Sequence, residues 1–190
     1  MEILSREEFT LEKARLGRKI LMGALFIHPT DTIYGIGCDA TNPEAVRTVR
    51  DVKQREDTPF SVIAPSKEWI RENCELLPNA ENWIEKLPGP YTLILPLKKM
   101  EGVAQEVNAG RSTLGVRIPD HWFSGVVEEL GIPVVTTSAN IHGHEFMTSL
   151  DDLSPLIAAK MSFAIFEGEK RGRPSKIVDL TTTGGRIIKR

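Results

Sequence analysis

The stretch ALFIHPTDTIYGIGCDATNPEAVRTVRDVK, residues 24–53, decides the expected fold because it holds a strand, a polar connection and a helix in series. The run at 24–28 is short and apolar and is followed by a proline, which is typical of a buried strand. Residues 28–40 combine hydroxyl and carboxyl side chains with two glycines. We therefore expect 28–40 to be a polar connection from this strand to the helix that follows it.

The helix in this stretch carries its own start signal. Thr41 or Asn42 is suited to cap it, Pro43 takes its first position, and apolar residues recur along one face. The pattern ends near Lys53, which predicts a helix between Pro43 and Lys53.

The rest of the chain repeats this alternation of elements. The sequence SREE at 5–8 is a capping box, and we expect a first helix from there to about Lys19. Further strand-like runs lie at 60–64, 91–97, 114–118, 133–137, 163–166, 176–180 and 186–189. Helix-like segments lie at 66–77, 79–87, 120–130 and 149–160, the last with Pro155 in a first turn. The alternation predicts an α/β protein with a mixed sheet, and the absence of an internal repeat or linker predicts one domain over residues 1–190.

Composition narrows the class of protein. The chain has 24 Lys and Arg against 26 Asp and Glu, a formal charge of -2, so no overall positive field draws it to nucleic acid. A charged stretch at 168–176 is expected to be a surface loop. The cysteines Cys38 and Cys74 lack the number and spacing of a disulfide framework or zinc site, and we expect half-buried thiols in a reducing compartment. The polar N-terminus and the short apolar runs predict a cytoplasmic protein.

Common catalytic and phosphate-binding motifs do not occur in the sequence. There is no G-x-x-x-x-G-K-[ST] loop, complete Rossmann turn, nucleophile elbow or H-E-x-x-H helix. The pair His142 and His144 has no further ligands at zinc spacing, so we expect no metal site there. The sequence instead offers polar clusters at the ends of expected strands and helices, where α/β sheets gather ligands.

The first cluster is the polar connection itself. Thr30 and Thr32 offer hydroxyls, Gly35 and Gly37 permit close approach of the backbone to a ligand, and Tyr34 can pack beside it. A tight turn whose side chains bond only their own backbone explains the segment equally well.

The second cluster is Lys53-Gln54-Arg55, at the end of the expected helix. A lysine and an arginine can converge on phosphates as a point charge and a bidentate fork. Cations also favour helix C-termini through the macrodipole, and this simpler explanation stays open.

The other two clusters follow later strands. The sequence VVTTSAN at 134–140 ends a β-branched strand with hydroxyl and amide groups suited to phosphate or carboxylate oxygens, or to a helix cap. Arg117 stands in an apolar strand, where its burial requires an anion. Either a substrate carboxylate or an internal Asp or Glu satisfies that requirement.

In order along the chain, PTDTIYGIGCDA, KQR, LPGPYTLIL, LGVRIP, TTSAN and PSKIVDL resemble the threonylcarbamoyl-AMP synthase family, the YrdC-like domain. The resemblance runs from about residue 10 to the C-terminus. Its most diagnostic part is K-x-R followed by S-x-N, present here as Lys53, Arg55, Ser138 and Asn140.

The resemblance implies an open, twisted mixed β-sheet with flanking helices around a concave, positively charged cavity, the YrdC/RibB-like fold. It implies an enzyme that forms threonylcarbamoyl-AMP and pyrophosphate from L-threonine, hydrogencarbonate and ATP, with magnesium bound through ATP. A partner transferase then carries the threonylcarbamoyl group to tRNA. No side-chain nucleophile is required, because orientation and charge neutralisation are the main demands of such a transfer.

The resemblance also assigns residues. It implies that Lys53, Arg55 and Ser138 hold the phosphates, that Asn140 shapes that site, and that these four are the catalytic set. Thr30 and Arg117 are implied to hold threonine, Arg117 through its carboxylate. Further implied substrate-binding positions are Thr32, Tyr34, Thr113, Thr136, Ser175 and Arg190.

Two departures from the family pattern leave an alternative open. Glu56-Asp57 replaces the proline that usually follows K-x-R, and IHGHEF at 141–146 replaces small polar residues. A paralogue without synthase activity, or an RNA-binding module using Lys170, Arg171, Arg173 and Lys176, is the alternative function.

Overall fold

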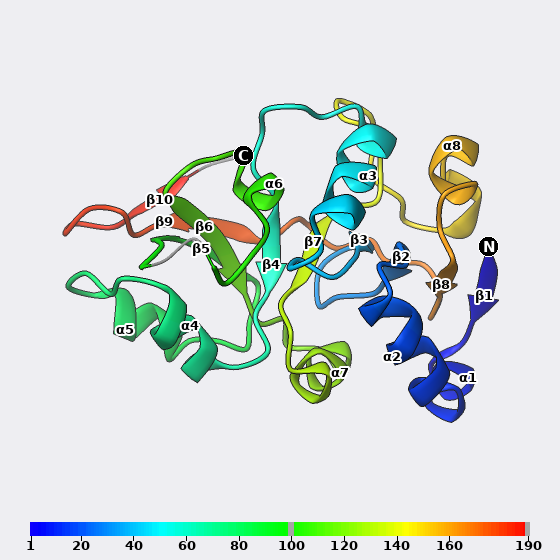
Figure 1. The fold of residues 1–190 in the computed structure, drawn as a ribbon, viewed down its shortest axis with the longest axis horizontal. Helices are drawn as coiled ribbons and strands as arrows, with labels where there is room; N and C mark the ends of the chain where they lie inside the picture. Colours follow the sequence, from blue (N-terminus) through cyan, green and yellow to red (C-terminus); the bar gives the residue numbers. More distant parts are fainter. Residues whose placement is uncertain (99–100, 189–190) are drawn as a thin grey trace.

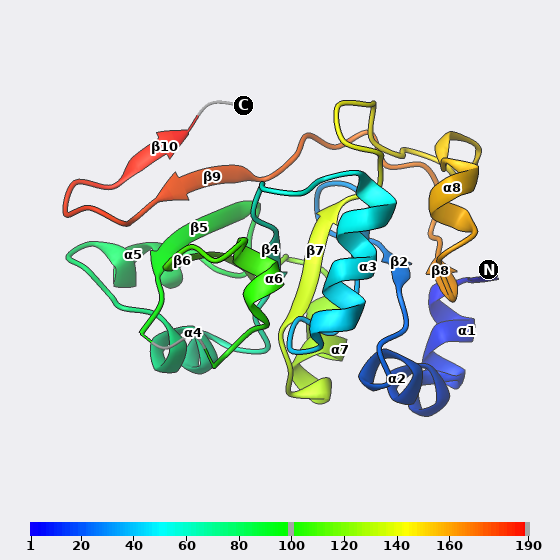
Figure 2. The ribbon, with the colours of Figure 1, turned by 45° about the horizontal axis from the view of Figure 1, so that its top comes forward.

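The computed structural model describes residues 1–98 and 101–188 and shows a mixed sheet of ten strands in the described chain, with helices packed on it (Figure 1). The strands are β1 (Glu2–Leu4), β2 (Phe26–His28), β3 (Gly35–Gly37), β4 (Ser61–Ile63), β5 (Tyr91–Pro96), β6 (Thr113–Arg117), β7 (Val134–Ser138), β8 (Phe163–Ile165), β9 (Lys176–Asp179) and β10 (Arg186–Ile188). Their order across the sheet is β1-β8-β2-β3-β7-β4-β6-β5-β9-β10. The N-terminus and the β9–β10 hairpin therefore lie at opposite ends of the molecule (Figure 2). The predicted α/β class is confirmed.

The helices are α1 (Arg6–Leu11), α2 (Lys13–Leu21), α3 (Pro43–Lys53), α4 (Lys67–Asn73), α5 (Ala80–Ile84), α6 (Gln105–Asn108), α7 (Phe123–Leu130), the 3-10 turn η1 (Leu150–Asp152) and α8 (Pro155–Ala158). In the part of the chain that the structure describes, no helix has the length and apolar character needed to cross a bilayer.

Local signals place several elements where the sequence predicts them. The Ser5–Glu8 capping box forms in full, and Asn42 caps α3 by accepting from Glu44 N–H and Ala45 N–H at 3.1 Å. The single helix expected as far as Lys19 is instead two helices, because the chain leaves helical geometry at Glu12. The strand β1 and the helix α6, of three and four residues, are too short to give a periodic pattern and were not predicted.

The expected connection at 28–40 is wrong in its middle, where the chain forms β3. This three-residue strand, Gly-Ile-Gly, pairs antiparallel with β2 on one side and with β7 on the other. Glycine disfavours strands in general, so the segment gives no strand signal in the sequence. As a result, the polar residues at 29–34 form a short loop between two paired strands rather than a long connection to α3.

The glycines of β3 make room for rings of the neighbouring strand. A Cβ at Gly37 would stand 2.7 Å from the Phe26 ring, and one at Gly35 would stand 2.8 Å from the His28 imidazole. Both distances are below van der Waals contact, so neither position accepts a side chain without movement of β2. The expectation that these glycines serve backbone access to a ligand is therefore wrong at Gly37, where the Phe26 ring fills the space, whereas Gly35 also lines the cavity described below.

Apolar side chains pack on both faces of the sheet. Along β2, Ile27 joins the larger core with α3, while its neighbour Phe26 joins a second core with α2 and α7. Phe26 stacks on the Phe163 ring at 5.1 Å, and the His28 ring stacks on Phe123 at 4.9 Å. Full burial of His28 lowers the pKa of its imidazole to about 3.

Both cysteine thiols are fully buried rather than half-buried. Cys38 and Cys74 form no disulfide and pack in the larger core. Burial raises the pKa of both thiols, which keeps them protonated.

We expect Gly37→Ala to lower the free energy of unfolding by about 1–3 kcal/mol, because the new methyl group overlaps the Phe26 ring. Gly125→Ala is the matched control, since a Cβ at this α7 position meets nothing within 4 Å. The control should unfold at the same or a slightly higher denaturant concentration than wild type. Urea denaturation measures both, and equal stability of Gly37→Ala and wild type would contradict this account of β3.

Candidate active site

A cavity of about 610 Å³ lies on one face of the sheet, across β3, β7, β4, β6, β5 and β9. The strand register explains the hollow: Ser61 lies opposite Gly115 on one neighbouring strand and opposite Thr136 on the other. Residues directly opposite in a sheet project to the same face. Because these residues are small, the face stays open at this point.

The cavity is cationic. Arg55, Arg111 and Arg117 line it, whereas Asp179 is the only carboxylate among the described residues of its wall. Such a concave, partly desolvated site favours a ligand that carries negative charge. The predicted concave, positively charged cavity is therefore present in the described fold.

Arg117, the last residue of β6, meets an internal carboxylate. Its Nη2 donates to Asp31 Oδ1 at 2.5 Å, and both side chains are about nine-tenths or more buried. The sequence left two possible anions for Arg117, a substrate carboxylate or an internal Asp or Glu. The structure shows the internal one, Asp31. Nη2 also donates to Thr32 Oγ1 at 3.4 Å, so the guanidinium is bound to the 29–34 loop.

Thr30 both borders the cavity and organises its own loop. Its hydroxyl donates to Ile33 O at 2.7 Å and accepts from the N–H groups of Thr32 and Ile33 at 3.1 and 3.2 Å. This local turn is the structural explanation that the sequence left open. Tyr34 also lines the cavity. Thr32 is not one of the described lining residues, but its hydroxyl accepts a hydrogen bond from Arg117.

Lys53 holds the turn that ends β7. The ammonium donates to Ser138 O at 2.6 Å, Asn140 O at 2.7 Å and Asn140 Oδ1 at 3.0 Å. Ser138 Oγ donates to the same Asn140 Oδ1 at 2.6 Å, which closes a compact network. The structure thus brings three members of the K-x-R and S-x-N signature into direct contact.

The side chain of Lys53 lies inside the protein. Lys53 ends α3 as predicted, and it is buried to 1 % exposure. Ser138 lines the cavity, whereas Lys53 and Asn140 stand behind its described wall. Burial, together with the nearby charge of Arg55, lowers the pKa of Lys53 to about 7.

Arg55 lines the cavity beside the Phe60 ring. Its Nη2 donates to Pro59 O at 2.8 Å, and its guanidinium lies 5.2 Å from the Phe60 ring centre. Arg50, which sequence reasoning missed, fixes this segment from the helix by donating to three carbonyls of residues 55–58 at 2.7–3.2 Å. Arg50 therefore holds the segment that contains the unusual Glu56-Asp57 pair. Because its acceptors are backbone carbonyls, the sequence gives no sign of these hydrogen bonds.

The remaining predicted positions lie along β6, β7 and the chain that enters β9. Thr113 and Thr136 line the cavity, and Ser175 lines it while sharing a 2.7 Å hydrogen bond with Thr92. Ser175 is buried, so the expected surface loop at 168–176 becomes a cavity wall at its end. Arg190 lies outside the described residues.

Two of the cations in the loop at 168–176 form ion pairs with nearby glutamates. Lys170 pairs with Glu167 at 2.6 Å, and Arg171 pairs with Glu169 at 2.9 Å. Tyr34 ties the same loop down, since its hydroxyl donates to Gly168 O at 2.7 Å and accepts from Glu167 N–H at 3.0 Å. The loop is thus attached to the cavity wall through Tyr34.

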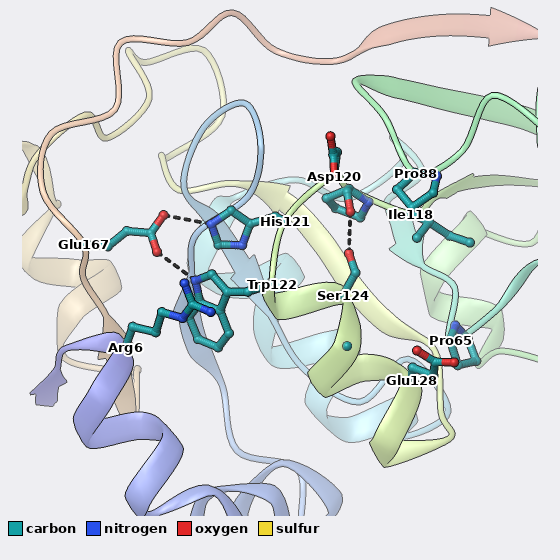
Figure 3. A pocket seen from close by; sticks show the side chains of 12 residues that line it. Arg6, Pro65, Pro88, Ile118, Asp120, His121, Trp122, Ser124, Glu128 and Glu167 are labelled. Carbon is teal, nitrogen blue, oxygen red and sulfur yellow. Dashed lines mark hydrogen bonds and ion pairs between the residues drawn. The ribbon is translucent and has the colours of Figure 1, made fainter.

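A second hollow of about 660 Å³ lies outside this cavity, beside α7 (Figure 3). Glu167 accepts from His121 Nε2 at 2.8 Å and from Trp122 Nε1 at 2.9 Å there. Burial opposes ionisation of Glu167, but hydrogen bonds from Lys170, Trp122 and His121 outweigh it and lower its pKa to about 2. The carboxylate therefore stays charged and holds this corner together.

Among the described cavity residues that sequence reasoning missed, three have ionisable side chains. Arg111, His142 and Asp179 line the cavity. Arg111 precedes a strand and Asp179 ends one, positions that charged residues commonly take, so neither gave a signal. His142 was noted only as half of a metal pair, and the described residues contain no cluster of three or more His, Cys, Asp or Glu suited to a metal.

A polar, arginine-lined hollow on one face of a mixed sheet defines an α/β protein whose cavity is suited to a small anionic ligand. The Sua5/YciO/YrdC family model, described as "Telomere recombination", matches residues 18–190. The chain therefore belongs to the Sua5/YciO/YrdC family, and the resemblance inferred from its motifs is confirmed.

Relatives and solved structures agree with this assignment. A Methanocaldococcus jannaschii protein provisionally named threonylcarbamoyl-AMP synthase is 37% identical over 93% of this chain and 84% of its own. The threonylcarbamoyl-AMP synthase of Marinobacter nauticus is 30% identical over 90% of this chain and 93% of its own. Two structures of Pyrococcus abyssi Sua5 superpose with TM-scores of 0.88 and 0.84 at 31% and 28% identity, and the second is a complex with L-threonine. They cover 98% and 99% of this chain, which spans only 59% and 56% of those longer chains.

We expect the free energy of unfolding to rise with pH above 7 because of Lys53. Below pH 7 the lysine is protonated in both states, but above it the folded protein releases the proton while the unfolded chain keeps it. The unfolded state then binds more protons, so stability increases by up to about 1.4 kcal/mol per pH unit.

Urea denaturation between pH 7 and 8.5, with Lys53→Met beside wild type, isolates this contribution. The variant should lack the rise, whereas Lys160→Met, at an exposed lysine, should retain it. An identical pH slope for wild type and Lys53→Met would show that Lys53 keeps its proton in the folded state.

Proposed function

We propose that the protein is a threonylcarbamoyl-AMP synthase, which makes threonylcarbamoyl-AMP and pyrophosphate from L-threonine, hydrogencarbonate and ATP. The observation that carries the proposal is that one cavity is bordered both by Arg117 and by Ser138 of the turn that Lys53 holds. A carboxylate-binding group and a phosphate-binding turn thus open onto the same space. The names of the relatives and the threonine complex of Sua5 support the same reaction.

Different residues of the cavity wall suit the two substrates. Arg55 and Ser138 would contact the phosphates, while Lys53 and Asn140 fix the turn that presents Ser138. A guanidinium and a hydroxyl are suited to neutralising and orienting phosphate oxygens.

Arg117 would bind the carboxylate of threonine. Thr30 and Tyr34 would border the amino acid from the 29–34 loop, with Thr32 bracing Arg117 from behind. Thr113, Thr136 and Ser175 would line the space between the two substrates. Arg190 would contact the nucleotide, a role that only the resemblance supports.

The chemistry needs positioning more than side-chain catalysis. The amine of threonine and hydrogencarbonate give a carbamate with loss of water. An oxygen of the carbamate then forms a bond to the α-phosphorus of ATP while the bond from that phosphorus to the pyrophosphate oxygen breaks. Arginine charges placed beside the phosphates stabilise the charge that accumulates on the leaving group. The cavity supplies such charges and offers no activated nucleophile among its described residues, in keeping with direct transfer.

Magnesium would enter as the complex with ATP. Asp179 is the one carboxylate on the described wall, and magnesium in nucleotide sites commonly takes one or two carboxylates together with phosphate oxygens and water. The residues therefore fit a metal that ATP brings with it. Its chemistry would be to neutralise phosphate charge.

Because the reaction transfers the adenylyl group of ATP, the protein would be a nucleotidyltransferase. A partner transferase that modifies tRNA would consume the product, as the resemblance implies. The enzyme would work as one domain over residues 1–190. One sheet running through the described chain supports the single domain.

We expect wild type to release pyrophosphate from ATP only when threonine and hydrogencarbonate are both present with magnesium. Ser138→Ala should lower this rate at least tenfold, because the turn loses its cavity hydroxyl. Its melting temperature should fall by no more than about 4 °C, the effect of one hydrogen bond.

Ser66→Ala serves as the control, since Ser66 caps α4 away from the cavity and accepts from Trp69 N–H at 3.0 Å. It should be at least as destabilised and yet retain the wild-type rate. Pyrophosphate release that ignores threonine would refute the function, and release driven by another amino acid would assign a different acceptor.

A further inference from the structure

We propose that Asp31 is a positioning residue that holds the Arg117 guanidinium ready for the carboxylate of the amino-acid substrate. The proposal rests on the function proposed above and adds to it a residue with no role in the motif. Its basis is the buried Asp31–Arg117 ion pair at the cavity wall.

The first step is the geometry of the pair. Arg117 Nη2 lies 2.5 Å from Asp31 Oδ1, with side-chain exposures of 7% and 10%. An arginine side chain has many rotamers, and an ion pair in a poorly solvated site selects one of them. Asp31 engages Nη2, and a guanidinium carries five N–H donors in a fixed fork, so the same group is chemically able to bind a second carboxylate.

The second step is that Asp31 is itself fixed from two directions. Its other oxygen, Oδ2, accepts Asp120 N–H at 3.1 Å, from the turn that leads from Ile118 to His121 (Figure 3). The Thr30 hydroxyl fixes the loop that carries Asp31 by bonding Ile33 O and the N–H groups within the turn. The carboxylate therefore joins the loop after β2 to the turn after β6, and Arg117 is anchored to both.

Loss of the Asp31 charge would change the binding of threonine more than the rate of the reaction. Without the Asp31 charge, a buried Arg117 would turn toward other acceptors, and threonine would have to draw it back on binding. That reorientation weakens binding, but saturating threonine completes it. Loss of Asp31 should therefore raise KM for threonine and change kcat much less, while the KM for ATP stays constant, because Asp31 contacts Arg117 and Asp120 rather than the proposed phosphate contacts Arg55 and Ser138.

The test is steady-state pyrophosphate release by wild type, Asp31→Asn and Asp39→Asn. Asparagine keeps the size of Asp31 but removes its charge. Asp39 is a matched control because it is also a buried aspartate, accepting from Thr41 N and Oγ1 at 2.8 and 2.7 Å away from the cavity. Asp31→Asn should raise KM for threonine at least tenfold, and Asp39→Asn should leave it unchanged whatever its melting temperature.

A second measurement separates positioning from mere stability. L-threonine amide lacks the carboxylate charge, so wild type should prefer threonine over the amide strongly, and Asp31→Asn should reduce that preference at least fivefold. A structural role alone does not move this ratio. Should Asp31→Asn fail to fold, Thr32→Val removes the second acceptor of Arg117 Nη2 and should still raise KM for threonine about threefold, by loss of one hydrogen bond.

The outcomes are distinct. No threonine-dependent activity in wild type refutes the proposed function and this inference with it. An active wild type with unchanged KM in Asp31→Asn, or in Thr32→Val if that is the folded variant, refutes the inference alone. A lower KM in Asp31→Asn refutes it too, because Asp31 would then compete with threonine for Arg117.

Discussion

The close packing of β3 against the rings of β2 is the constraint from which the site follows. Because Gly35 and Gly37 carry no side chain, β3 lies directly against Phe26 and His28 and pairs with β7 on its other edge. Gly35 then stands opposite Ser138. This register places the 29–34 loop, which precedes β3, next to the turn that ends β7. Two polar segments about a hundred residues apart in sequence thus border one cavity.

Two buried cations lie at or beside the cavity, Arg117 in its wall and Lys53 outside the lining, and the protein stabilises them in different ways. Lys53 is surrounded by carbonyl and amide oxygens, which compensate a charge by dipoles. Arg117 faces a full negative charge on Asp31. Desolvation penalises both cations, and removing a partner from a buried charge is more harmful than removing the pair. The Lys53 arrangement therefore suits a fixed support, and the Arg117 arrangement suits a group whose orientation is set by an internal charge.

Local chemistry made much of the fold predictable from the sequence. The Asn42 cap with Pro43 behind it defines α3, and the β-branched run before Ser138 defines β7. The motifs also identified Arg55, Arg117 and Ser138 of the cavity wall. Neither β3 nor the partners of the buried cations could be predicted in this way. A Gly-Ile-Gly strand has no strand propensity of its own, and it forms because two neighbours supply its hydrogen bonds.

The partners of Lys53 were hidden for a related reason, since backbone carbonyls belong to every residue type and leave no mark in a sequence. Asp31 was visible but ambiguous. It lies 86 residues from Arg117, and an aspartate in a turn is ordinarily explained by its own backbone. Only the register of β3 brings the two together. Strand register also explains the hollow: it aligns the small residues Ser61, Gly115 and Thr136 on three neighbouring strands, and the face they leave open is the one that Arg117 borders.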